Sequence, residues 1–226
     1  MSTPPQFLGS EITYGVEPNL HAACYLRGTR ILTPKGEVAI ENLAIGDEVL
    51  TASGACRPVR WLGFRRVNCT KHPQPDAVWP VLVRAGAFAD GAPRRDLWLS
   101  RKHAVFVDGA LIPVEKLINE STIVQLPRSE VEYWHVELDA HDIVLAEGLA
   151  AESYLDTGNR TAFINGGAFI EAHPDFTPRH WADTCVPLVL KGPVLEAAKR
   201  GLEDRAAALG DAVPNGAELP REASRA

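Results

Sequence analysis

Short runs in which apolar and polar residues alternate dominate the first two thirds of the chain. Residues 30–33 form one such run, Pro34-Lys35-Gly36 follows it, and residues 37–40 form the next. Alternation with a period of two is typical of a strand with one buried face, and proline and glycine between two runs mark a turn. The pattern therefore predicts that this part of the chain is built from short β-strands.

Further strands follow at similar spacing. Asp108-Gly109 stands between two apolar runs and is a strong signal for a β-hairpin, because both residue types accept the backbone conformation of a two-residue turn. Residues 68–77 are polar and contain prolines, so we expect a loop there. Many short strands with few helical segments indicate an all-β domain. The remaining expected strands are 48–51, 57–67, 78–84, 97–107, 111–113, 122–126, 133–138 and 142–146.

Both ends of the chain lack this alternation. Residues 1–21 contain several prolines and glycines and no clear period, so we expect a leader or linker. Near the other end, Gly192-Pro193 opens a stretch in which Leu195, Ala198, Leu202 and Leu209 fall near one face of a helix. We therefore predict three parts. They are a leader over 1–21, a β-domain over 22–154, and an extension over 155–226 with one helix at about 193–209 and a disordered end.

Composition and charge narrow the classes of function. The chain has 226 residues, a hydrophobic content of 46% and a formal net charge of -6, with a pI of about 5.7. An acidic balance argues against a nucleic-acid binder, which usually presents a basic face. No apolar run is long enough to span a membrane, and the first residues lack the basic start and apolar core of a signal peptide. We expect a cytoplasmic protein, with export by a route without a cleavable signal left open.

The four cysteines are Cys24, Cys56, Cys69 and Cys185. None of them forms a CxxC pair, which argues against a zinc site. The absence of an export signal favours thiols over disulfides. We expect neither a metal nor a cofactor.

Cys24 stands immediately before the first expected strand. Its thiolate can attack the carbonyl of Ala23 and form a thioester, provided that the site stabilises the oxyanion and protonates the departing amine. On composition alone, an ordinary buried thiol is the more frequent explanation.

A second candidate stretch is "LWLSRKHAVFVDG", which contains Ser100 and His103. If the chain turns at Arg101-Lys102, the hydroxyl and the imidazole can face one small pocket. Ser100 could then orient the scissile amide, and His103 could protonate its nitrogen. Taken alone, a surface turn with an incidental histidine explains the spacing better.

The third stretch, residues 133–160, carries His135, Asp139, His141 and Asp142. Alternation puts His135 and Asp139 on one face and leaves His141 after the bend. Two histidines six residues apart are a weak set of metal ligands. A hydrogen-bonded His–Asp pair at a hairpin is the preferred interpretation.

The three stretches, in this order, resemble the Hint (hedgehog/intein) family, and most closely the bacterial Hint proteins that are not splicing inteins. "CYLRGTRILTPKGEVAIENLAIGDEVLT" is similar to the opening block of the family. "LSRKHAVFVDG" is similar to the block that supports the first acyl shift, and "HDIVLAEGLAAES" to the block that closes the domain. The resemblance covers about residues 22–154. It implies a compact, horseshoe-like all-β domain that cuts or rearranges its own backbone.

The resemblance also implies roles for single residues. Cys24 matches the nucleophile of the acyl shift, and Ala23 matches the residue whose carbonyl is attacked. Ser100 falls on the family's threonine position, and His103 on the histidine of the same block. The closing block adds His141 and Asp142 as candidate catalytic residues. The sequence leaves open which of these two, or Asp139, faces the site.

The chain departs from the splicing pattern at the end of the domain. Inteins end in His-Asn followed by Cys, Ser or Thr, whereas Glu152-Ser153 stands here, followed by Tyr154. No asparagine can cyclise there, so we expect the N-to-S acyl shift and attack on the thioester by water or another nucleophile, without complete splicing. The substrate is then the chain's own N-terminal flank, and no partner of the extension is indicated. Two alternatives are a Hint module that binds without cleaving, and a cysteine hydrolase acting on other molecules.

Overall fold

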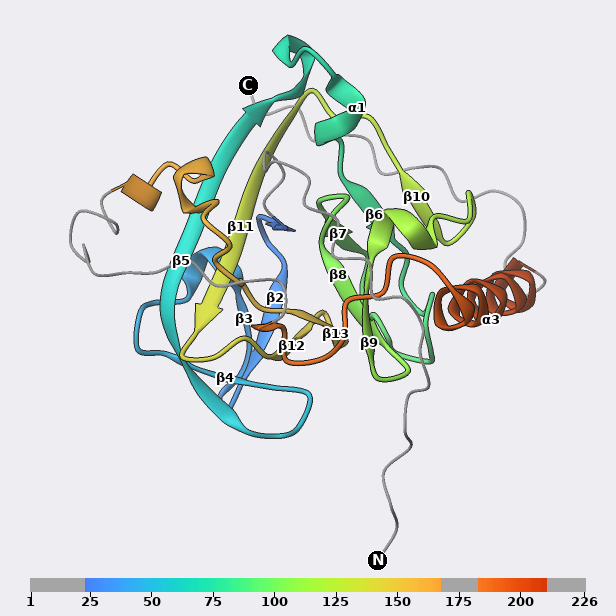
Figure 1. Ribbon diagram of the computed structural model, residues 1–226, viewed down its shortest axis with the longest axis horizontal. Helices are drawn as coiled ribbons and strands as arrows, with labels where there is room; N and C mark the ends of the chain where they lie inside the picture. The colour runs from blue at the N-terminus through green and yellow to red at the C-terminus, as the bar shows by residue number, and fades with distance from the viewer. Residues whose placement is uncertain (1–22, 168–182, 211–226) are drawn as a thin grey trace, which may run out of the picture.

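The computed structural model describes residues 23–167 and 183–210. Thirteen strands of the described chain form two antiparallel sheets (Figure 1). The expectation of an all-β domain followed by one helix is confirmed. The seven-stranded sheet has the order β10 (Ile123–Gln125), β6 (Val81–Val83), β7 (Leu97–Leu99), β1 (Tyr25–Leu26), β11 (Glu130–Leu138), β5 (Cys56–Asn68) and β4 (Glu48–Leu50). The six-stranded sheet has the order β3 (Gly36–Ala39), β2 (Arg30–Thr33), β12 (Ile143–Ala146), β13 (Leu149–Glu152), β8 (Ala104–Val107) and β9 (Ala110–Pro113).

The long strands β5 and β11 form the main ribbon of the larger sheet (Figure 1). They pair from Glu130 opposite Asn68 to Leu138 opposite Val59, with a bulge at the end of β11. Gly63 lies in the middle of β5, where a Cβ atom would come within 2.1 Å of the Trp61 ring. A glycine is therefore needed for Trp61 to fold back over its own strand.

Two tight hairpins build the smaller sheet. β8 and β9 are joined at Asp108-Gly109, and both residues have positive φ values of 48° and 83°. β12 and β13 are joined in the same way at Glu147-Gly148, with φ values of 51° and 82°. Asparagine, aspartate and glycine accept this left-handed conformation most easily, so the hairpin expected at Asp108-Gly109 is confirmed.

Other expected segments differ in detail. The single strand expected over 97–107 is two strands, β7 and β8, because the chain turns at residues 100–103. The strand expected over 78–84 shortens to β6, and the expected loop at 68–77 contains short helical turns. The short helices are η1 (Ile40–Asn42), η2 (Cys69–Lys71), α1 (Pro75–Val78), η3 (Val114–Leu117) and η4 (Arg160–Ala162).

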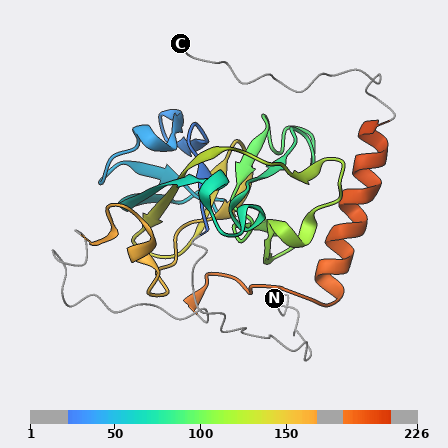
Figure 2. The same cartoon turned by 90° about the horizontal axis from the view of Figure 1, so that it is seen from above.

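The described part of the extension packs onto the β-domain. The backbone of Leu111 in β9 accepts from Val189 and donates to Pro187, so this segment lies along the edge of the smaller sheet. Helix α3 (Pro193–Gly210) then lies along one side of the domain (Figure 2). Leu195, Ala198 and Leu202 belong to the main hydrophobic core. The expected leader, 1–21, and the expected disordered end lie outside the described residues.

Candidate functional site

The candidate site is built around the peptide bond between Ala23 and Cys24. Cys24 is fully buried and precedes β1, the short strand that lies between β7 and β11. Ala23 is only half-buried. The chain therefore enters the β-domain at this bond: the side chain of Cys24 is inside the domain, and Ala23 lies at its surface.

Ser100 holds the backbone of Cys24 on two sides. Its Oγ accepts a hydrogen bond of 2.8 Å from the Cys24 N–H, and its own N–H donates to the Cys24 carbonyl, also at 2.8 Å. The pairing of Tyr25 with Leu99 brings the two residues together across 76 positions of sequence. A hydroxyl thus accepts from the nitrogen of the candidate scissile bond.

His103 follows Ser100 in the turn between β7 and β8. Its ring centroid is 4.1 Å from that of Tyr25 and 5.0 Å from that of His135. Neither ring nitrogen has a hydrogen-bond partner among the described residues. The nearby carbonyls of Cys24 and Glu152 accept from other donors, namely the Ser100 N–H and the Tyr25 O–H. Burial lowers the pKa of His103 to about 4, against the weaker raising effects of the Glu152 charge and of the nearby backbone of Glu152 and Cys24, so the ring is neutral at pH 7.

The Cys24 thiol is neutral as well. Burial raises its pKa to about 11, and the neighbouring Arg65 lowers it only in part. Arg65 stands on β5 opposite Tyr133, with its guanidinium carbon 5.4 Å from the centre of the Tyr133 ring. Arg65 was not among the residues expected at the site. The alternation of β5, which puts Arg65 on the same face as the buried Trp61, was the available signal.

His135 belongs to the site, although the sequence analysis gave it no role. Its ring lies 5.3 Å from the ring of Tyr154, in addition to its contact with His103. Its Nδ1 accepts from the Val136 N–H, which leaves the proton of the neutral ring on Nε2. Burial, followed by the charges of His103 and His141, keeps the pKa of His135 well below its usual value. His135 is therefore a neutral donor.

Glu152 is the carboxylate of the site and was also missed as a candidate. It is 5% exposed; its Oε1 accepts from the Ala104 N–H at 2.7 Å, and its Oε2 lies 3.8 Å from His141 Nε2. The Nδ1 of His141 accepts from the backbone N–H of Cys185 at 3.1 Å. The extension thus reaches the site through this hydrogen bond.

The charge state of His141 follows from these neighbours. Burial lowers its pKa, but the contacts of the ring with Cys185 and with the Glu152 carboxylate, 3.8 Å from Nε2, raise it to about 9. The negative charge of Glu152 favours the protonated, positively charged ring.

The expected His–Asp pair does not form. The carboxylate of Asp142 contacts Arg57 Nε and accepts from the Ile143 N–H. Asp139 also pairs with Arg57, at 3.2 Å. Of the three residues left open by the sequence, only His141 contacts the site, because Glu152 rather than an aspartate is its partner.

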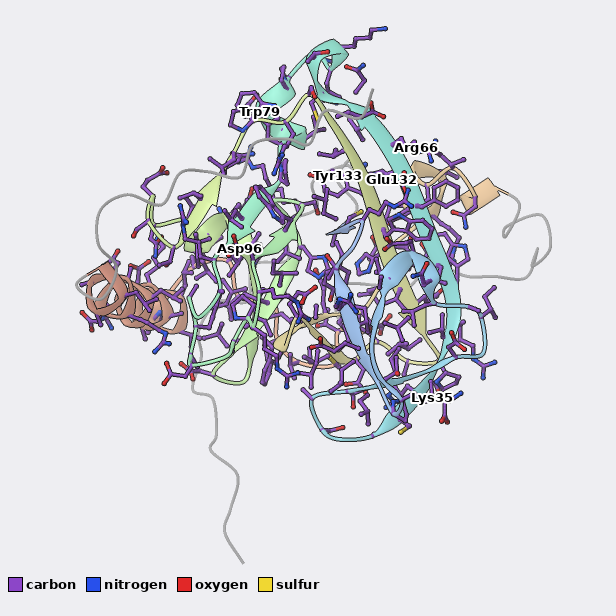
Figure 3. All side chains as sticks on the ribbon, turned by 180° about the vertical axis from the view of Figure 1, so that it is seen from behind. Lys35, Arg66, Trp79, Asp96, Glu132 and Tyr133 are labelled. Atoms are coloured by element: carbon purple, nitrogen blue, oxygen red, sulfur yellow. The ribbon has the colours of Figure 1, made fainter. Side chains whose placement is uncertain are left out.

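A small pocket opens beside the bond. It has a volume of about 30 Å³, and its lining includes Ala23, His135, Glu152, Tyr154 and Asn159. The larger hollow of the domain, about 370 Å³, lies elsewhere, between Cys69, Trp79 and Arg128. Figure 3 labels Trp79 at that end of the molecule, beyond Tyr133.

The described residues also bear on disulfides, metal sites and membrane-spanning helices. None of the four cysteines is in a disulfide. Among residues 23–167 and 183–210, no group of three or more His, Cys, Asp or Glu side chains could hold a metal ion. No described helix is both long and apolar enough to cross a membrane.

The family model of the Hint domain matches residues 23–158. No curated protein matches the chain. Among solved structures, the chain is similar to a bacterial intein-like domain from Clostridium thermocellum, with 18% identity, a TM-score of 0.41, and coverage of 58% of this chain and 98% of that one. It is also similar to a DnaB intein from Synechocystis, with 9% identity, a TM-score of 0.42, and coverage of 59% and 99%.

Proposed function

The chain belongs to the Hint domain family, and on that premise we propose that it cleaves its own backbone between Ala23 and Cys24. Members of this family rearrange a peptide bond at the start of the domain, where Cys24 stands here. The support from this chain is the hydrogen bond of 2.8 Å from the Cys24 N–H to Ser100 Oγ. It holds the nitrogen that must leave, in a site that also contains a buried imidazole.

The first step is an acyl shift from nitrogen to sulfur. The sulfur of Cys24 attacks the carbonyl carbon of Ala23, and the bond from that carbon to the Cys24 nitrogen breaks. Because the thiol pKa is about 11 and that of His103 about 4, both groups are neutral at pH 7. His103 accepts the thiol proton and delivers it to the departing nitrogen, so one group serves as base and then as acid.

Arg65 contributes at the same moment. Its guanidinium beside Cys24 stabilises negative charge on the sulfur, which otherwise is costly to form in a buried position. Ser100 keeps the amide nitrogen in one orientation during the attack. The positioning of reacting groups can contribute several kcal/mol to a rate, roughly 7–11 in the best cases.

The second step removes the acyl group from sulfur. A nucleophile attacks the thioester carbonyl of Ala23, the carbon–sulfur bond breaks, and the leader is released while Cys24 becomes the new N-terminus. Cyclisation of an asparagine, as in splicing, is not expected here because Glu152-Ser153 stands where inteins carry His-Asn. Cleavage without splicing is therefore the activity that the sequence supports.

One observation favours the alternative of a Hint module that does not cleave. Cys24 is 0% exposed and its neutral thiol is strongly favoured, which are also properties of an ordinary core cysteine. The hydrogen bonds of Ser100 would then only secure the start of β1.

An intact-mass time course separates the two candidates. The purified chain is incubated at pH 7.5 with and without hydroxylamine, beside the variants Cys24→Ala and Cys56→Ala. Self-cleavage predicts loss of residues 1–23, acceleration by hydroxylamine, no cleavage in Cys24→Ala and normal cleavage in Cys56→Ala, whose thiol is exposed rather than buried. A mass that stays constant in every sample favours the binding module.

A further inference from the structure

The pocket beside Ala23 has the size and the lining of a water site. Its volume of about 30 Å³ exceeds the roughly 10–15 Å³ that one water needs, and it is too small for a sterol or another bulky acceptor. Polar side chains line it, including His135, Glu152 and Asn159. A water held there would have the several hydrogen-bond partners that a buried water requires.

The pocket also lies on the acyl side of the bond. Ala23, whose carbonyl would carry the thioester, lines it, whereas Cys24 does not. A molecule in the pocket therefore lies next to the residue that has to be attacked in the second step.

Glu152 is placed to act on such a water. One carboxylate oxygen accepts from the Ala104 N–H, and the other faces His141. A carboxylate has about four acceptor positions, so both oxygens retain acceptor capacity. His141 and Ala104 also fix the rotamer of Glu152, which is the usual requirement for a general base.

We propose that the pocket holds the water that resolves the thioester and that Glu152 is its general base; the proposal rests on the self-cleavage proposed above. The water oxygen bonds to the carbonyl carbon of Ala23 while one of its protons passes to Glu152. The carbon–sulfur bond then breaks, and the proton passes from Glu152 to the Cys24 sulfur. The products are a leader that ends in a free carboxyl group at Ala23 and a chain that begins with the Cys24 thiol.

His135 also lines the pocket and can support this step. With its Nδ1 occupied by the Val136 N–H, it presents an Nε2–H donor. We assign this donor to the oxyanion that forms on the Ala23 carbonyl oxygen during attack.

The decisive variant is Glu152→Gln, compared with Glu132→Gln. Glu132 is a partly buried carboxylate on β11 that pairs with Arg66 on β5, as Figure 3 shows, and it does not line the pocket. We expect Glu152→Gln to slow cleavage in plain buffer by about 10²–10⁴-fold, the usual contribution of a general base. Cleavage in hydroxylamine should stay near the wild-type rate, because that nucleophile needs no base. Glu132→Gln should match the wild type in both.

Three outcomes separate the two proposals. Cleavage of Glu152→Gln in buffer at the wild-type rate overturns the role of Glu152 while leaving self-cleavage intact. If Glu152→Gln is slowed equally with and without hydroxylamine, the defect lies in the acyl shift, and the role of Glu152 as the base in thioester hydrolysis is overturned. If neither the wild type nor the variant cleaves in hydroxylamine, the self-cleavage on which the inference rests is itself wrong.

A measurement on the wild-type chain covers the case in which Glu152→Gln does not fold. In water enriched in ¹⁸O, the released leader should carry one ¹⁸O atom at its new carboxyl group. Hydroxylamine should accelerate cleavage at least tenfold more than O-benzylhydroxylamine, whose ring does not fit the pocket. Equal acceleration by both nucleophiles would show that attack does not occur through this pocket.

Discussion

Replacing His103 with leucine should stabilise the protein while abolishing its chemistry. The imidazole is completely buried and neither ring nitrogen has a partner among the described residues. Each buried polar atom without a partner costs about 1–3 kcal/mol. Leucine removes both atoms at similar volume. It also loses the ring contacts with Tyr25 and His135, about 0.5–1.5 kcal/mol each, and adds up to about 1.5 kcal/mol of repacking.

The free energy of unfolding at pH 7 should therefore rise by about 1–3 kcal/mol in His103→Leu, and the advantage should grow in acid. The pKa of His103 falls from 6.5 in the unfolded chain to about 4 in the folded one. Between pH 6.5 and pH 4, His103 is protonated in the unfolded chain but not in the folded one. The free energy of unfolding of the wild type therefore decreases as the pH is lowered. Between pH 7 and pH 5 this loss is about 2 kcal/mol, and the leucine variant does not share it.

Urea denaturation at several pH values measures both effects. Both chains carry Cys24→Ala so that the backbone stays intact, and contributions from His135, His141 and Glu152 largely cancel in the difference. The reasoning is refuted if His103→Leu is less stable than its parent at pH 7. It is refuted equally if the difference between the two chains is the same at pH 7 and pH 5. Such results would show that the imidazole is hydrogen-bonded and titrates normally.

Three further predictions test the surroundings of the site. Ser100→Ala should slow the acyl shift by about 10–100-fold in the mass assay, since the Cys24 N–H loses its acceptor, whereas Ser100→Thr should retain most of the rate. Arg160→Met should lower the free energy of unfolding in urea by about 3–5 kcal/mol, because it removes the cation that pairs with the buried Asp156 and with Glu137; an unchanged midpoint would contradict this. Cys185→Pro removes the N–H that binds His141 and should slow release of the leader several-fold, while Cys185→Ala, which keeps that N–H, should behave as the wild type.

The sequence predicts strands well where alternation is regular and turns are marked. The run 30–33 is a strand with those bounds, and the hairpin at Asp108-Gly109 forms as expected. Two strands had no such signal. β1 has only two residues, and β13 reads Leu-Ala-Ala-Glu, in which the only polar residue is buried at the end. Both exist because neighbouring strands supply their hydrogen-bond partners, which no local pattern records.

The candidate site shows the same limit for side chains. Cys24, Ser100 and His103 could be proposed from sequence because they stand in stretches that resemble blocks of the Hint family in the same order. Arg65 and Glu152 were not proposed, because their roles depend on contacts with residues far away in the sequence. A His–Asp pair was expected at this hairpin, but Asp139 and Asp142 both pair with Arg57, and the carboxylate that faces His141 comes from Glu152 at the end of β13.

The extension changes how the domain boundary should be understood. Composition separates residues 155–226 from the β-domain, yet Leu195, Ala198 and Leu202 lie in the same hydrophobic core as the strands. Burying three such side chains contributes several kcal/mol, so α3 is held firmly. In the segment that precedes α3, the N–H of Cys185 donates to His141, and His141 faces Glu152. The extension therefore couples the packing of the core to the carboxylate assigned to thioester hydrolysis, and detaching α3 should impair the release of the leader before it unfolds the sheets.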